Sequence, residues 1–164
     1  MINGSFTIIS WDGRALFLKR KDTGLWDLTG GGFDVNEIDY KAVSIREIRE
    51  ETGIIVDKDS LHLVAVLGQR LPKRIQEIYP VENGLVFLHS LFLRNNPVIN
   101  ISDEHSDFKF FSYSEILDNW KDFSSGPLWL YFTFLKFQES CKLQEGLLRD
   151  RSIWQGKKYL HWQD

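Results

Sequence analysis

Short runs of apolar and β-branched residues, bounded by polar or glycine-rich segments, recur along the chain and predict β-strands. The first two runs flank Asp12-Gly13, a dipeptide typical of the tight turn of a hairpin. Residues 21–32, which follow the second run, are rich in glycine and are expected to form a loop. The predicted strands are residues 5–11, 15–20, 61–68, 84–93 and 108–112.

Helical spacing of apolar positions begins after the glycine-rich segment. Over residues 39–52, Tyr40, Val43 and Ile48 fall roughly on one helical face, and Gly53 is a natural helix end. The pattern therefore predicts a helix of about three to four turns, since an α-helix has 3.6 residues per turn.

Two more helices are predicted in the second half of the chain. Ser112 or Ser114 is a candidate cap for a short one, and the strongly apolar residues 126–140 indicate a helix in the core or at a dimer face. Strands alternating with helices predict one α/β domain with a mixed sheet over residues 1–140. Residues 141–164 are expected to be an extension packed on the same domain.

The composition and net charge of the chain disfavour several classes of protein. The 164 residues include 43% hydrophobic residues, enough for a packed core, and the net charge of −3 disfavours general nucleic-acid binding. The single cysteine, Cys141, fits a reducing compartment. No apolar run is long enough to cross a membrane. We therefore expect a cytoplasmic protein that does not bind membranes.

Carboxylates crowd one face of the first predicted helix. Glu47, Glu50 and Glu51 are spaced i, i+3 and i+4. Like charges about 6 Å apart repel by roughly 3 kcal/mol at an effective dielectric constant near 20. A hard divalent cation such as Mg²⁺, or Mn²⁺ in its place, would offset that repulsion. The alternative is an ordinary acidic helix surface exposed to water.

The same segment resembles the Nudix box, the signature G-x5-E-x7-R-E-U-x-E-E-x-G-U of the Nudix hydrolase family, in which U is aliphatic. The sequence REIREETGI, residues 46–54, matches the second half of that box at every specified position. The sequence LWDLTGGG upstream is similar to the aromatic lead into the family's glycines. The resemblance implies an α/β/α sandwich with a mixed sheet.

The first half of the box departs from the pattern. Counting back from Arg46, the box glycine is Gly32 and the position of the first box glutamate is occupied by Ile38. The acidic residue is the preceding one, Glu37. Counting forward from Gly31, the spacing to Glu37 is correct. One extra residue therefore precedes Arg46, and we hypothesise that a local bulge lets Glu37 still contact Arg46.

The resemblance implies a Mg²⁺-dependent pyrophosphohydrolase that cleaves the diphosphate bond of a nucleoside diphosphate linked to another moiety, such as a nucleoside triphosphate or a nucleotide sugar. It also implies roles for the box residues. Glu50 and Glu51 bind metal, Glu47 binds metal or takes a proton from water, Gly31 or Gly32 offers a backbone carbonyl to the metal, and Arg46 holds a box glutamate in place.

A further carboxylate is expected from the loop at residues 102–107. Glu104 is the candidate for a further metal ligand or for the general base, with Asp103 and Asp107 as rivals. An ordinary polar loop is the alternative, and His105 is expected to lie at the surface.

Basic residues Arg70, Lys73 and Arg74 are candidates for a clamp on substrate phosphates, although a solvated loop would carry the same residues. Two other functions stay open: a catalytically weak nucleotide sensor with the same fold, and an RNA 5′ pyrophosphohydrolase. The expected partner is a small-molecule nucleotide, and the apolar helix leaves a homodimer open.

Overall fold

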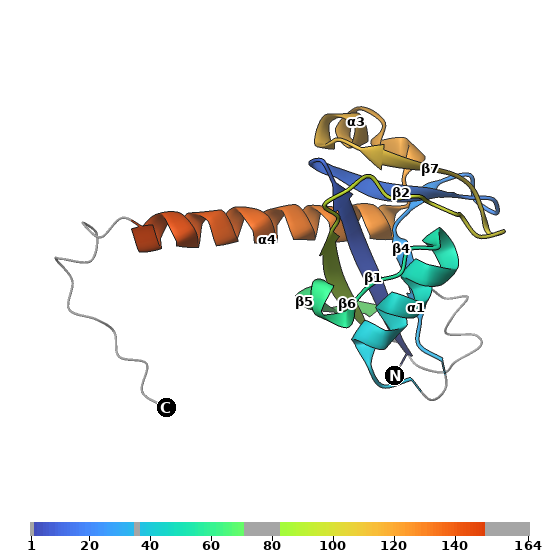
Figure 1. The fold of residues 1–164 in the computed structure, drawn as a ribbon, viewed down its shortest axis with the longest axis horizontal. Helices are drawn as coiled ribbons and strands as arrows, with labels where there is room; N and C mark the ends of the chain where they lie inside the picture. The colour runs from blue at the N-terminus through green and yellow to red at the C-terminus, as the bar shows by residue number, and fades with distance from the viewer. Residues whose placement is uncertain (1, 35–36, 71–82, 150–164) are drawn as a thin grey trace.

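The computed structural model of the chain describes residues 2–34, 37–70 and 83–149 (Figure 1). Seven described strands form one mixed sheet, ordered β3-β2-β1-β6-β5, with β4 also paired to β1 and β7 to β2. β1 and β6 are parallel neighbours, and the other pairs are antiparallel. The strands are β1 (Ile2–Trp11), β2 (Arg14–Arg20), β3 (Trp26–Asp27), β4 (Thr29–Gly32), β5 (His62–Arg70), β6 (Asn83–Phe92) and β7 (His105–Phe111).

The predicted hairpin is confirmed. Asp12 and Gly13 join β1 to β2 with φ of 50° and 70°, the left-handed values that a two-residue hairpin turn requires. β7 begins at His105, three residues before the predicted strand at 108–112, because its backbone pairs with β2 as far as Arg20.

The glycine-rich segment, residues 21–32, was predicted to be a loop, and this prediction is wrong for part of it, because the segment contains β3 and β4. β4 pairs antiparallel with β1 along Gly4–Thr7. Gly30 has a φ of 153°, and a Cβ there would lie 2.7 Å from the Cα of Phe6, so only glycine fits this approach. Glycine is depleted in ordinary strands, which is why its presence indicated a loop.

Helices form where the pattern predicted them. α1 (Tyr40–Thr52) begins after Asp39, whose carboxylate accepts hydrogen bonds from the amides of Lys41 and Ala42, and it ends at Gly53 in the left-handed conformation. Ser112, rather than Ser114, caps α3 through a capping box. The remaining helical elements are η1 (Lys58–Ser60), α3 (Tyr113–Asp118), η2 (Trp120–Asp122) and α4 (Ser125–Arg149).

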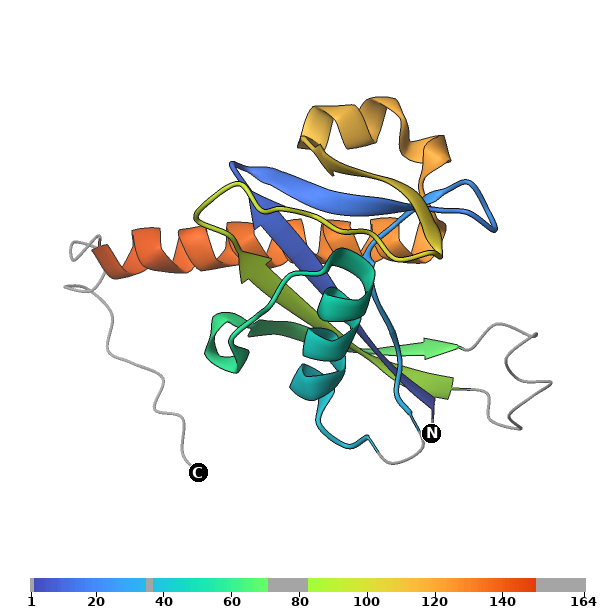
Figure 2. The same ribbon diagram turned by 45° about the vertical axis from the view of Figure 1, so that its right-hand side comes forward.

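The sheet lies between α1 on one face and α4 on the other (Figures 1 and 2), so the predicted α/β/α sandwich is confirmed. Two separate cores correspond to the two faces. Ile48 of α1 packs with the cluster that contains Ile9, Leu16, Leu18, Leu61 and Leu91. The larger cluster joins Phe17, Leu88 and Phe111 of the sheet to Leu130, Tyr131 and Phe134 of α4.

α4 is longer than the predicted helix at 126–140 and runs without a break through the boundary expected at residue 140. Its C-terminal part projects beyond the sheet (Figure 1). Among the described residues, no helix has the length and apolar character needed to cross a bilayer. How residues 150–164 pack lies outside the described residues and stays a prediction.

Candidate functional site

The carboxylates of α1 lie against the glycine strand β4. Glu51 is 8% exposed, and its Oε2 accepts a hydrogen bond of 3.0 Å from the Gly30 amide. Glu47 lies directly over Gly31, where an added Cβ would be 2.7 Å from the Glu47 Cδ. Glycines therefore allow the two glutamates of the helix to approach the strand backbone.

Pairing within the sheet sets the direction of each glycine peptide. Phe33 N donates to Asn3 O (3.0 Å), so by alternation the Gly31 peptide also faces β1. The polar groups of Gly30 and Gly32 point away from β1. Gly30 N donates to Glu51 Oε2 at 3.0 Å, and Gly32 O accepts from Arg46 Nη2 at 3.1 Å. Of the two glycines predicted to offer a carbonyl to the metal, Gly32 is the one whose carbonyl points away from β1, and it accepts a hydrogen bond from Arg46.

Arg46 organises the outer part of this cluster. Its guanidinium donates to both oxygens of Glu37, at 3.0 and 3.1 Å, in a bidentate pair. It also contacts Glu47 at 2.8 Å and Glu50 at 3.1 Å. Ile38, which occupies the expected box position, is 93% exposed. The hypothesised contact between Glu37 and Arg46 is thus present despite the extra residue.

Burial is the largest influence on the pKa values of Glu47 and Glu51, the two glutamates that lie against the glycine strand. Desolvation raises the pKa of Glu51 to about 8; the Gly30 amide opposes this shift, and the charges of Glu47, Asp27 and Glu104 add to it. Desolvation also raises the pKa of Glu47, against the attraction of Arg46. A cation placed here would favour the ionised forms, because opposite charge offsets both burial and mutual repulsion.

Glu50 differs from its neighbours. Its side chain is 57% exposed and meets Arg46 on the outer side of α1, whereas the side chains of Glu47 and Glu51 are 13% and 10% exposed. Of the three glutamates predicted to share one helix face, only Glu47 and Glu51 are held against the glycine strand.

The loop before β7 brings two of its residues to this cluster. Glu104 lies in an exposed turn, and its charge raises the pKa of Glu51. Asp103 and Asp107 are also exposed. His105, expected at the surface, is instead 3% exposed, because β7 begins with this residue and turns its side chain inward. Its Nε2 lies 3.9 Å from Glu51 Oε1.

Asp27 is a residue that sequence reasoning missed. Burial raises the pKa of its carboxyl, and its charge in turn raises the pKa of Glu51. Its backbone lies in β3, paired with Leu18. Because residues 21–32 were expected to be a loop, nothing in the pattern singled out this position; recognising the glycines as a strand would have placed it beside the site.

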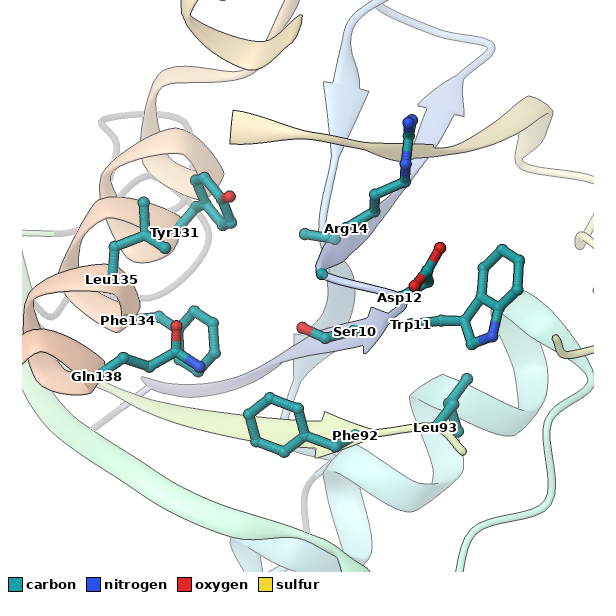
Figure 3. Close-up of a pocket in the computed structure, with 12 residues that line it drawn as sticks. Ser10, Trp11, Asp12, Arg14, Phe92, Leu93, Tyr131, Phe134, Leu135 and Gln138 are labelled. Carbon is teal, nitrogen blue, oxygen red and sulfur yellow. The ribbon is translucent and has the colours of Figure 1, made fainter. Parts of the chain in front are cut away.

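The three side chains of the predicted phosphate clamp lie outside the described residues. Arg70 is the last residue of β5, and Lys73 and Arg74 follow it in the chain. A cavity of about 180 Å³ between the β1–β2 hairpin and α4 (Figure 3) is lined by none of the predicted site residues. The carboxylate cluster, and not this cavity, therefore remains the candidate site.

The donors of the cluster suit a hard divalent cation. They are carboxylate and backbone oxygens, the ligands that Mg²⁺ and Mn²⁺ prefer. In the part of the chain that the structure describes, no three His, Cys, Asp or Glu side chains converge closely enough to hold an ion as they stand. Arg46 engages Glu47 and Glu50 instead. Metal binding would therefore require these two carboxylates to turn from Arg46.

Comparison with known proteins agrees with this fold. The model of the NUDIX domain matches residues 3–129, which is more than half of the chain. The chain therefore belongs to the Nudix family.

Two curated relatives match shorter stretches. A MutT-like protein from Streptomyces ambofaciens is 43% identical over 54 residues, covering 33% of this chain and 34% of that protein. A putative 8-oxo-dGTP diphosphatase from Bacillus subtilis is 47% identical over 51 residues, covering 30% and 34%. The chain thus matches about a third of the length of each relative.

A solved structure shares the fold over a longer stretch. It is a bifunctional NMN adenylyltransferase/ADP ribose pyrophosphatase from Francisella tularensis, in complex with AMP and a manganese ion. The TM-score is 0.64 at 21% identity, covering 85% of this chain and 42% of that protein. This likeness shows the fold of the chain.

Proposed function

We propose that the chain is a Mg²⁺-dependent pyrophosphohydrolase that cleaves the diphosphate bond of a nucleoside diphosphate linked to another moiety. Nucleoside triphosphates and nucleotide sugars are the favoured substrates. The observation that carries the proposal is the buried carboxylate of Glu51, held against the Gly30 amide and flanked by Glu47. A fold that buries two mutually repelling carboxylates gains most when a cation binds them.

The residues of the site have different proposed roles. Glu47, Glu50 and Glu51 would hold the metal, together with the Gly32 carbonyl. When bound, the metal would offset the negative charge of the diphosphate and lower the pKa of the attacking water. Arg46, fixed by its bidentate pair with Glu37, positions Glu47 and Glu50 in the absence of metal.

We assign the general base to Glu104. It is exposed to solvent and close enough to raise the pKa of Glu51, so it is placed to accept a proton from water and release it to solvent. Glu47 is the rival, but its carboxylate is held by Arg46 and lies over Gly31.

The relatives support a nucleotide substrate. One is named for action on 8-oxo-dGTP, and the structural neighbour was solved with AMP and manganese. We therefore also propose that Mn²⁺ substitutes for Mg²⁺ and that Arg70, Lys73 and Arg74 contact the phosphates. The proposed location is the cytoplasm, where a lone cysteine stays reduced.

The sensor alternative loses its main support. Displacement of the first box glutamate was the sequence feature that favoured a chain that binds nucleotide without cutting it. Because Glu37 reaches Arg46 from its shifted position, the pair expected of an active site is intact.

A substrate panel tests the proposal. It comprises nucleoside triphosphates, nucleotide sugars, ADP-ribose, dinucleoside polyphosphates and 5′-triphosphorylated RNA, each with Mg²⁺, with Mn²⁺ and with EDTA. Products are identified by mass spectrometry. Metal-dependent cleavage of one nucleotide class is expected. No cleavage of any compound, together with tight nucleotide binding, would establish the sensor instead.

A further inference from the structure

The loop before β7 is hydrogen-bonded to the last turn of α1. Asn100 N donates to Thr52 O (2.8 Å), and Ser102 N donates to Glu51 O (3.3 Å). These bonds satisfy carbonyls that a helix C-terminus otherwise leaves free. A Cβ at Gly53 would lie 3.1 Å from the Asn100 Cβ, so the glycine helps the loop approach closely. The loop is therefore fixed relative to the backbone of Glu51.

Side chains of the same loop also reach the Glu51 carboxylate. Ser102 Oγ lies 3.0 Å from His105 Nδ1, and His105 Nε2 lies 3.9 Å from Glu51 Oε1. The His105 side chain is 1% exposed, so the ring has little freedom to turn away. The contacts therefore form a closed circuit. It runs from the main-chain carbonyl of Glu51 to Ser102, from Ser102 to His105, and from His105 back to the carboxylate of Glu51.

The tautomer of His105 follows from these neighbours. A neutral imidazole has one N–H donor and one acceptor nitrogen. Once a cation holds Glu51 in its ionised form, its oxygens can only accept hydrogen bonds, which favours the proton on His105 Nε2, and the Ser102 hydroxyl can then donate to Nδ1. In this form the Nε2–H group of His105 lies 3.9 Å from Oε1, while Gly30 N donates to Oε2.

We propose that Ser102 and His105 form a positioning pair that orients the Glu51 carboxylate for metal binding. This inference rests on the proposed function, because it assigns the pair a role at the same site. The separation of 3.9 Å is longer than a hydrogen bond. The imidazole therefore orients Oε1 electrostatically without occupying its lone pairs, which stay free for a cation.

The pair also ties the general base to the metal site. Glu104 directly precedes His105, and its carbonyl accepts a bond of 2.9 Å from Lys21 N. With His105 held beside Glu51 and the Glu104 carbonyl bonded to the chain after β2, the backbone of Glu104 keeps a fixed position relative to Glu51. A purely structural histidine would fill the same space but would not need an N–H directed at Glu51.

The experiment measures Mn²⁺ affinity of the full chain by electron paramagnetic resonance, without nucleotide, alongside thermal unfolding. His105→Leu keeps the bulk and removes the N–H, whereas His105→Gln keeps a donor at a similar position. We expect His105→Leu to bind Mn²⁺ about 10- to 100-fold more weakly, and His105→Gln to recover most of the loss. Ser102→Ala should weaken binding in the same direction, and the exposed His62→Leu should leave it unchanged.

Several results would overturn the inference. One is a folded His105→Leu variant with wild-type Mn²⁺ affinity, and another is a Gln variant as weak as the Leu variant. If His105→Leu does not fold, Ser102→Ala decides instead, and wild-type Mn²⁺ affinity in that folded variant would overturn the positioning role. A wild-type chain that binds no Mn²⁺ contradicts the proposed function itself. If the wild type binds Mn²⁺ and the variants bind it with the same affinity, only the positioning role is contradicted.

Discussion

The buried carboxylate of Glu51 predicts an unusual pH dependence of stability. Its pKa in the folded chain is about 8, against an ordinary value of 4.5, and burial is the largest cause. The folded state therefore holds this proton more tightly than the unfolded state does. The stabilisation linked to it is fully present below pH 4.5 and is lost as the pH rises through 8.

The magnitude follows from that pKa difference. Each unit is worth about 1.4 kcal/mol, so relative to low pH the metal-free chain has lost roughly 3 kcal/mol of this stabilisation at pH 7 and about 5 kcal/mol well above pH 8. Glu51→Gln removes the titration and keeps an oxygen that can accept from Gly30 N. The variant should therefore become progressively more stable than wild type as the pH rises.

Urea unfolding in EDTA at pH 5, 7 and 9 tests this expectation. The stability advantage of Glu51→Gln over wild type should grow by about 4 kcal/mol between pH 5 and pH 9. Glu50→Gln is the matched control, because its side chain is 57% exposed and its difference from wild type should stay flat. An advantage of Glu51→Gln that is the same at pH 5 and pH 9 would show that Glu51 does not hold its proton through burial.

Three further changes probe the site. Glu50→Gln should lower turnover by orders of magnitude in a steady-state assay while thermal unfolding shows a folded chain; near-native turnover would show that the metal ligands are misassigned. Glu104→Gln should lower kcat more than it raises KM, and an unchanged kcat would transfer the role of base to another acid. Glu37→Gln should reduce kcat/KM about tenfold by loosening Arg46, whereas Ile38→Gln, at a position 93% exposed, should not; equal effects would argue against the Glu37–Arg46 contact.

Much of the fold could be predicted from the sequence, because local chemistry set it. Asp12-Gly13 specifies a hairpin turn, Gly53 ends a helix, and Ser112 caps one, each through the backbone angles or hydrogen bonds of a few neighbours. The spacing of Glu47 and Glu51 likewise placed both on the face that meets the glycine strand.

Features that depend on distant contacts could not be predicted. β4 is a strand because its backbone pairs with β1, and Gly30 is required there because β1 lies too close for any side chain; both are visible only in the folded chain. The half-buried position of Asp27 and the burial of His105 follow from the pairing of β3 and β7 with β2. No local pattern of charge or hydrophobicity distinguishes these two residues from ordinary polar loop residues.

The proposed metal site is tested most directly by turnover of the nucleotide that the panel selects, at saturating concentration, across a Mg²⁺ titration in wild type and Glu51→Gln. We predict no wild-type turnover in EDTA, a saturable rise with Mg²⁺, and turnover near background at every Mg²⁺ concentration in the folded variant. Turnover that survives EDTA, or a Glu51→Gln variant with the wild-type Mg²⁺ dependence, would mean that Glu51 does not bind the catalytic metal.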